Sequence, residues 1–480
     1  GEYVTVLQLA SSRHDKKFVA ELLKHGADPN IRGGKHETAL LTAVHTKYFK
    51  IVKLLLEHGA ETSIDLATRI LQEASGGGAH EVVKLLLNRG ADPNAARGGE
   101  KGTALQYATT YDNYYVEITR MLLDHGADPN IQGGDYGTPL AAVAAEGQLE
   151  ILQDLLQSGA NPNVKAGDFG SALHAAVHYP KPRDDVTQVL KLLLDNGADV
   201  NIQRPSDSQT ALYSASCLGL PKVIQLLIEK GADIHIQGGE YGTSLLAACH
   251  WGGLAVFKIL LQHGADITIN GGEYGTMLQA ASAAGELEIV KILLQMGANP
   301  NDTGGKYMTA LQAACFKGYM EIVKILLKNG ADTNITGGMA GTAVQAASYG
   351  YNPTYTGSLQ MVKLLLEHGA DVNIQGGEYG SALAAASHAG KLQIVNLLLE
   401  KGADINIQGG KYCTALQAAC ASRQRELVEL LLEKGADPNI RGGQFETAYQ
   451  AALYEQDHYL MNILERKGAE TDLITTLNEV

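Results

Sequence analysis

One short phrase constrains the fold of this chain more than any other feature of its sequence: Gly-Ala followed by Asp, Asn or Glu. The phrase occurs fourteen times, and eight of the thirteen intervals between its glycines are 33 residues long. A fixed period of about 20–50 residues is typical of solenoids, in which each unit packs against its neighbours alone. We therefore expect one continuous array over residues 1–480, with terminal units at about 1–26 and 447–480. The repeated glycines are Gly26, Gly59, Gly90, Gly126, Gly159, Gly197, Gly231, Gly264, Gly297, Gly330, Gly369, Gly402, Gly435 and Gly468.

Each unit is predicted to contain two short helices and a projecting turn. The second helix carries Ile, Val and Leu at helical spacing, as in "EIVKILLKNG" at 321–330, and the glycine of the phrase ends it in a left-handed conformation. The histidines that precede this glycine are expected to be structural, since they lie in the last helical turn. They are His25, His58, His125, His263 and His368. The first helix begins at Thr with Gln three residues later, the pattern of a capping box. This pattern occurs at Thr103, Thr276, Thr309, Thr342 and Thr414.

The turn repeats the motif Gly-Gly-Glu-Tyr-Gly, as at 376–380. Gly376, Gly377 and Gly380 are expected to adopt backbone conformations that other residues resist. An aromatic residue recurs in the turn, and it either packs on the adjacent hairpin or contacts a partner. The series is interrupted at Met339–Ala340. Its members are Tyr136, Phe169, Tyr241, Tyr274, Tyr307, Tyr379, Tyr412 and Phe445.

These features resemble the ankyrin repeat, whose 33-residue unit is a turn followed by two helices. The T-P-L-H motif of that family becomes T-A-L-Q in most units, while Pro139 keeps the proline and His174 keeps the histidine. The resemblance implies an all-α ankyrin-repeat solenoid of about 14 helix-turn-helix repeats with projecting hairpin turns. It also implies partner binding on a concave side formed by the turns and first helices. The turn motif is similar to that of long fungal ankyrin arrays, which often follow a NACHT-type NTPase module.

Three insertions separate the first and second helices of their units, at 109–117, 178–186 and 349–358. Neutral drift is one explanation, because long loops cost little stability. Partner binding is the other, because tyrosine beside Asn, Gly and Ser is typical of protein-binding loops. The candidate contact residues in these insertions are Tyr111, Tyr114, Tyr115, Tyr179, Tyr349, Tyr351 and Tyr355.

Four further candidates come from departures within the repeat. Trp251 is the only tryptophan and ends a first helix where other units carry Lys317, Ala284 or Gly350. Either a buried role or an exposed contact fits this position, and tryptophan is enriched at binding hot spots. Phe316 and Tyr319 are aromatic residues at the helix turns, and Met339 interrupts the series of turn aromatics. Residues 339–357 are therefore the best candidate for a specialised site.

The unit between Gly59 and Gly90 is two residues short and lacks the Gly-Gly hairpin. The sequence "GGGAH" at 76–80 is expected to place three glycines between its helices. Because glycine weakens a helix, early local opening is predicted over residues 60–80.

Composition narrows the class of protein further. The net charge of −14 disfavours nucleic acid as a partner. Five widely spaced cysteines form no zinc motif, and three share one repeat position after an Ala-Ala pair, where a thiol behaves as a small hydrophobe. This pattern, with no signal peptide and no apolar stretch near 18 residues, favours an intracellular and cytoplasmic protein without membrane insertion. The chain begins inside a repeat without Met, so a fragment of a larger multidomain chain is expected.

Catalytic motifs are not found in the sequence, and no cofactor or metal is expected. The favoured function is a non-catalytic scaffold that binds a protein or peptide. The alternatives are an enzyme whose cleft is built from the aromatic insertions, and the cytosolic array of a larger membrane protein.

Overall fold

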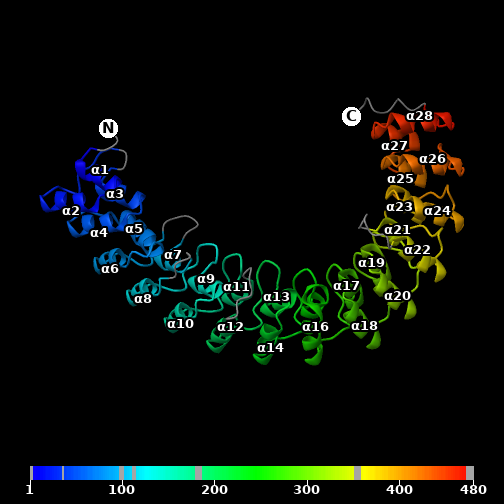
Figure 1. Ribbon diagram of the computed structural model, residues 1–480. Coiled ribbons are helices and arrows are strands. Elements are labelled where there is room, and N and C mark those ends of the chain that lie inside the picture. Colours follow the sequence, from blue (N-terminus) through cyan, green and yellow to red (C-terminus); the bar gives the residue numbers. More distant parts are fainter. Residues whose placement is uncertain are drawn as a thin grey trace. The chain divides into compact units, whose positions relative to one another are not determined.

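The computed structural model describes residues 4–34, 37–96, 102–110, 115–178, 186–350 and 358–471. Within these ranges the chain forms twenty-eight α-helices and one π-helical segment, and no strand longer than an isolated bridge. The helices follow one another as the predicted pairs, which confirms the all-α repeat fold (Figure 1). Two compact units are present, 1–215 with 222–236, and 216–221 with 237–480. That a single array runs without a break from residue 1 to 480 stays a prediction.

In the first unit, most first helices pack against the first helix of a neighbouring pair, and most second helices pack against a neighbouring second helix (Figure 1). Its helices are α1 (Val6–Ser12), α2 (Lys16–Lys24), α3 (Ala39–His45), α4 (Phe49–Glu57), α5 (Ile64–Gly76), α6 (His80–Asn88), α7 (Ala104–Thr110), α8 (Val116–Asp124), α9 (Pro139–Glu146), α10 (Leu149–Gln157), α11 (Ala172–His178), α12 (Val186–Asp195), α13 (Ala211–Cys217) and α14 (Pro221–Glu229), the division falling at the end of α13 and the start of α14.

The second unit repeats this packing of first helix on first helix and second on second. Its elements are α15 (Ser244–Ala247), the π-helical segment η1 (Ala248–Gly252), α16 (Gly253–Gln262), α17 (Met277–Ala284), α18 (Leu287–Gln295), α19 (Ala310–Lys317), α20 (Met320–Lys328), α21 (Ala343–Tyr349), α22 (Ser358–Glu367), α23 (Ala382–His388), α24 (Leu392–Glu400), α25 (Ala415–Ala421), α26 (Arg425–Glu433), α27 (Ala448–Tyr454) and α28 (His458–Arg466).

The second helices are amphipathic, and α20 shows the pattern. Ile322, Val323 and Leu326 are buried, while Glu321 faces solvent. Gly330 follows the helix with a φ of +83°, the left-handed conformation that the sequence predicts. Four of the histidines before such glycines place Nδ1 2.8–2.9 Å from the carbonyl oxygen four residues earlier, which supports their structural role. They are His58, His125, His263 and His368.

The turns are narrow hairpins closed by an isolated bridge, such as Gly376–Gly380. Gly377 and Gly380 have φ values of +64° and +76°, and a Cβ on either would collide with the backbone of a neighbouring hairpin. Gly376 differs from the prediction, because its φ is not positive and an added Cβ would make ordinary contacts. Neighbouring hairpins are joined by main-chain hydrogen bonds between the residues that precede the turn aromatics. In the second unit these bonds link Glu240, Glu273, Lys306, Met339, Glu378, Lys411 and Gln444 in order.

The glutamine of the T-A-L-Q motif joins one repeat to the next. The side-chain amide of Gln345 accepts from the Thr342 amide and donates to the carbonyl oxygens of Ile374 and Gly380. Full capping boxes form at Thr276 and Thr342, and also at Thr5. At Thr309 and Thr414 the hydroxyl caps the helix, but the glutamine binds the following hairpin and not the N-cap backbone. At Thr103 only the glutamine contact to the Thr103 amide is present. The prediction of capping boxes is therefore only partly right. The side-chain amide of the glutamine also donates to backbone carbonyls of the next repeat.

The short unit between Gly59 and Gly90 replaces its hairpin with helix. Helix α5 begins after Ser63 and runs for 13 residues, against seven or eight in most first helices. Gly76 is the last residue of this helix, so two of the three glycines, and not three, lie between α5 and α6. Ile64, at the start of the extension, is 86% exposed.

Candidate partner-binding surface

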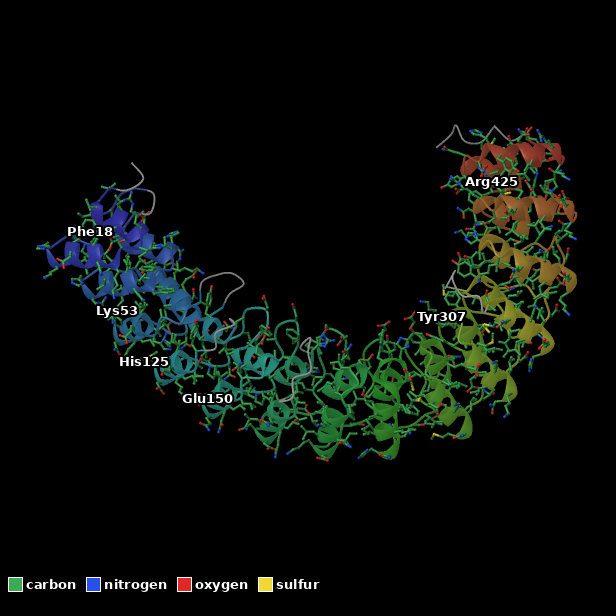
Figure 2. All side chains as sticks on the ribbon, in the orientation of Figure 1. Phe18, Lys53, His125, Glu150, Tyr307 and Arg425 are labelled. Atoms are coloured by element: carbon green, nitrogen blue, oxygen red, sulfur yellow. The ribbon has the colours of Figure 1, made fainter. Side chains whose placement is uncertain are left out.

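Aromatic side chains stack along the hairpin side of the second unit. The ring centroids of Tyr241 and Tyr274 are 5.8 Å apart, and those of Tyr274 and Tyr307 are 6.2 Å apart. Tyr379, Tyr412 and Phe445 continue the series at 6.1 and 6.2 Å. Rings from the ends of first helices lie between them, as His250 does between Tyr241 and Tyr274. We call this set the aromatic ladder, and Figure 2 labels Tyr307 within it. Its members are Tyr241, His250, Tyr274, Tyr307, Phe316, Tyr349, Tyr379, His388, Tyr412, Phe445 and Tyr454.

The stacking shows that these turn aromatics pack on neighbouring hairpins, which is one of the two alternatives left by the sequence. In the described part of the first unit, Tyr136 and Phe169 stack in the same way at 5.4 Å. Tyr307 is 4% exposed and belongs to a small core with Ala283 and Ala313. Packing does not remove every ring from solvent, so some rings remain available for contact.

The ladder passes from the hairpins to the first helices where the series of turn aromatics is interrupted. Ala340 stands where the adjacent hairpins carry Tyr307 and Tyr379, so one turn ring is missing. Two rings from the first helices replace it. Phe316 lies 5.5 Å from Tyr307 and 6.1 Å from Tyr349, and Tyr349 lies 4.6 Å from Tyr379. The ladder therefore continues past the missing ring through α19 and α21.

A pocket of about 230 Å³ lies beside Ala340, where the ladder passes to the first helices. Phe316, Tyr349 and Tyr379 supply aromatic walls, and Glu378 supplies the carboxylate. The remaining lining residues are Met339, Ala340, Gln345 and Ala346. Five of the eight lining residues belong to the segment 339–357 that the sequence singled out, and its role as a specialised site stays a prediction.

Trp251 lies in the π-helical segment η1 and is 61% exposed. Its indole Nε1 donates a hydrogen bond to the Tyr241 hydroxyl at 2.6 Å, and its ring meets that of His250 edge-on at 4.7 Å. These contacts hold a large apolar surface in one orientation while leaving most of it in solvent. Trp251 is therefore not a buried packing residue, and its contact with a partner stays a prediction.

The other candidates have different surroundings. Met339 is 43% exposed at its hairpin, and Phe316 is partly buried within the ladder. Tyr319 is 36% exposed, but its ring covers Gly285 of the preceding repeat. Tyr115 covers Gly78 in the same way, so both rings also serve packing between repeats. Five candidates lie outside the described residues: Tyr111, Tyr114, Tyr179, Tyr351 and Tyr355.

Burial perturbs the ionisable groups of this surface. It raises the pKa of Tyr274 and Tyr379 well above the usual range, so both phenols stay neutral. It lowers the pKa of His250 and His388, which favours neutral imidazoles within the stacks. Lys391 donates from Nζ to the Tyr349 carbonyl oxygen at 2.8 Å, and burial lowers the pKa of its ammonium to about 8.

The family model for ankyrin repeats (3 copies) matches residues 2–65, 70–166, 140–238, 173–271, 244–337, 277–376 and 344–442. These matches cover most of the 480 residues. The chain belongs to the ankyrin-repeat family.

Two curated relatives match shorter stretches of these ankyrin repeats. Potassium channel AKT2/3 of Arabidopsis thaliana is 35% identical over 109 residues, which are 22% of this chain and 13% of the channel. An ankyrin repeat-containing protein of Treponema pallidum is 46% identical over 50 residues, which are 10% of this chain and 17% of that protein. The chain therefore spans less than a fifth of either relative.

Membership of the ankyrin family also explains His174, which occupies the family's histidine position. Its Nδ1 lies 2.8 Å from the Ser171 hydroxyl, and its Nε2 lies 2.8 Å from the Gln209 carbonyl oxygen. The glutamines of other repeats bind the equivalent carbonyl, as Gln345 binds that of Gly380. Histidine and glutamine therefore perform one structural task at this position.

The described part of the chain has no helix long and apolar enough to cross a membrane, and no group of three His, Cys, Asp or Glu that could hold a metal ion. Cys249, Cys315 and Cys420 are at most 1% exposed, and burial raises the pKa of each thiol. These three behave as the small hydrophobes that their shared repeat position predicts.

The sequence did not predict the pocket, nor that the ladder passes through the first helices at Phe316 and Tyr349. Phe316 and Tyr349 had been singled out separately, as a helix-turn aromatic and as an insertion residue. Both stand seven residues after the capping threonine of their repeats, Thr309 and Thr342, as His250 does after Thr243. Aligning that position against the turn aromatics would have revealed the interleaved rings.

Proposed function

We propose that this chain is a non-catalytic recognition scaffold that binds a protein or peptide through the hairpin side of its second unit. Ankyrin repeats are in general modules for protein–protein interaction, and the family is typically non-catalytic. The observation that carries the proposal is Trp251, a largely exposed indole held by Tyr241 beside a stacked ladder. An oriented aromatic side chain loses little conformational entropy on binding, and tryptophan is among the most frequent hot-spot residues.

The proposed contact surface extends from Trp251 along Phe316, Tyr319 and Met339 to Tyr349. Tyr351 and Tyr355 belong to it as a prediction from sequence, as do Tyr111, Tyr114, Tyr115 and Tyr179 in the other two insertions. Nucleic acid is a poor candidate because a net charge of −14 repels phosphate. A cytoplasmic location fits the buried thiols, since such side chains persist in reducing compartments. Attachment to a NACHT-type module in a longer chain stays a prediction from the fungal resemblance.

A displayed random-peptide library, selected against the full chain, tests the proposal because it assumes nothing about the identity of the partner. Peptides that bind would be synthesised, and their dissociation constants measured by isothermal titration calorimetry. Trp251→Ala and Tyr349→Ala should each weaken binding by roughly 5- to 150-fold, the range expected for hot spots. Removal of residues 350–356 should abolish binding while changing the melting temperature little.

Met296→Ala is the matched control, because Met296 is 50% exposed but follows the second helix α18. It should leave peptide affinity unchanged. Equal affinity for wild type, Trp251→Ala and the deletion would place the site elsewhere and refute the proposal.

A further inference from the structure

The pocket beside Ala340 has a composition that points to one kind of side chain. Its aromatic walls are Phe316, Tyr349 and Tyr379, and its carboxylate is that of Glu378. At about 230 Å³ it is smaller than the roughly 300–1,000 Å³ of small-molecule sites, so a single side chain suits it better than a cofactor. The inference below rests on the proposed function, because the side chain belongs to the partner.

The Glu378 carboxylate differs from that of Glu273 in the residues that the adjacent hairpins place beside it. On one pair of adjacent hairpins a lysine and a glutamate form a close ion pair, with Lys306 Nζ 2.8 Å from Glu273 Oε1. Glu378 has the uncharged Met339 on the preceding hairpin. Within the described residues its cationic contact is Lys411 Nζ on the following hairpin, at 4.0 Å. Among the described residues, Glu378 therefore has a cation on the side of the following hairpin and none on the side of the preceding hairpin, where the pocket lies.

The second unit contains an internal example of the chemistry that would fill this pocket. The Arg425 guanidinium lies 5.0 Å from the ring centroid of Tyr459 (Figure 2 labels Arg425). The same guanidinium donates from Nε and Nη2 to the two carboxylate oxygens of Asp457, both at 3.1 Å. A planar cation can therefore stack on a tyrosine and bind a carboxylate at once.

We infer that the pocket is a receptor for an arginine side chain of the partner. The guanidinium stacks against Tyr349 or Tyr379 and donates two hydrogen bonds to Glu378. Its methylene stem lies along Met339 and Phe316. In this arrangement the guanidinium takes the place of the turn ring that Ala340 lacks.

Three competing occupants fit the pocket less well. A lysine ammonium could pair with Glu378 but has no flat face to stack. An aromatic side chain could stack but would bring no cation to the Glu378 carboxylate, whose contact with Lys411 spans 4.0 Å. A carboxylate from the partner would be repelled by Glu378 and by the net charge of −14.

Ligand-observed NMR titrations with Nα-acetyl-arginine N-methylamide test the inference on the full chain. The matched probes are the corresponding citrulline, lysine and phenylalanine derivatives. The arginine probe should bind with an affinity at least about five-fold above each of them, because citrulline keeps the shape but not the charge. Glu378→Gln should lower arginine affinity about five-fold or more.

Ala340→Tyr should abolish the binding, because it restores the residue that neighbouring hairpins carry at this position. Glu240→Gln is the matched control, since Glu240 holds the equivalent position in a hairpin whose ring is present. It should leave arginine binding unchanged. Circular dichroism spectra and melting curves establish that each variant is folded.

Several results would overturn the inference. One is equal binding of arginine and citrulline, and another is preference for the phenylalanine probe. Absence of arginine binding to wild type would also overturn it, as would binding that appears only after removal of residues 351–357, since the chain itself would then be the occupant. Library-selected peptides that depend on Trp251 but not on Glu378 would refute the arginine site and leave the proposed function standing.

Discussion

Replacement of His174 by glutamine is expected to make the first unit less sensitive to acid. His174 is 1% exposed, and burial lowers the pKa of its imidazole from 6.5 to about 4. The imidazole is held between the Ser171 hydroxyl and the Gln209 carbonyl, with Arg204, Asp207 and His178 as the nearest ionisable groups. Protonation in the folded state is therefore unfavourable until the pH approaches 4.

The direction of the pH dependence follows from linkage. In the unfolded chain His174 takes up its proton near pH 6.5, whereas the folded chain does not bind that proton until about pH 4. The stability that depends on a neutral His174 is fully present above pH 6.5 and is lost as the pH falls from 6.5 towards 4. The loss amounts to roughly 2 kcal/mol at pH 5 and about 3 kcal/mol below pH 4.

Glutamine at position 174 has no such titration and can donate to the same carbonyl, as Gln345 does in its own repeat. At pH 7 the His174→Gln variant should therefore lie within about 1 kcal/mol of wild type. At pH 5 it should be about 2 kcal/mol more stable than wild type, relative to their difference at pH 7. Other histidines with lowered pKa values, including His178 and His250, contribute equally to both proteins and cancel in the comparison.

Amide hydrogen exchange over residues 171–212, corrected for intrinsic rates, is the appropriate assay. Long repeat arrays do not unfold in two states, so a local readout is needed. The reciprocal variant Gln312→His is the control, since it should introduce acid sensitivity around α19 in the second unit. Parallel losses of protection in wild type and His174→Gln between pH 7 and 5 would refute the reasoning.

Four further outcomes are expected. Gln345→Ala should lower the local stability of α21 by about 2–3 kcal/mol, measured by amide hydrogen exchange, because it leaves the Thr342 amide and the Ile374 carbonyl without their partner; a loss below about 0.5 kcal/mol would contradict this. Met308→Gly should raise local stability by about 1 kcal/mol, measured as slower amide hydrogen exchange in α19, because Met308 has a φ of +72°. Thr268→Asn should add up to about 1 kcal/mol of local stability, since asparagines at this position, such as Asn301, bond to the Gly330 carbonyl and the Asp332 amide of the next repeat; unchanged amide hydrogen exchange in α18 would count against it. Residues 60–80 should exchange their amides earlier than 270–300, because α5 replaces a hairpin and ends in glycines, and equal protection would refute this.

The glutamines of the T-A-L-Q motif show where prediction from sequence reached its limit. A Thr followed three residues later by Gln is a local pattern, and it predicted helix starts at Thr309 and Thr342 correctly. The same pattern could not show that Gln312 donates to Ile335, 23 residues away, because that contact depends on how two repeats stack. A capping box and a link between repeats use the same residue type, so the sequence supported only the first.

The candidate surface was likewise predicted only in part from the sequence. The sequence singled out Trp251, Phe316, Met339 and Tyr349, and the structure places three of them around one pocket and leaves Trp251 exposed. The sequence did not single out Glu378, because this glutamate is one copy of a repeated motif. Its significance comes from Met339 and Ala340 on the preceding hairpin, which remove a cation and a ring from its surroundings.

The sequence by itself determined the repeat, the helix pairs, the glycine that ends each second helix and the hydrophobic character of the three cysteines at one repeat position. Each of these follows from interactions within a few residues, and repetition along the chain makes them unmistakable. The tertiary structure decided which side chains of one repeat meet those of the next. The course of the aromatic ladder, the pocket beside Ala340 and the helix that replaces a hairpin at 64–76 depend on that meeting, because residues about 33 positions apart come into contact only when the repeats stack.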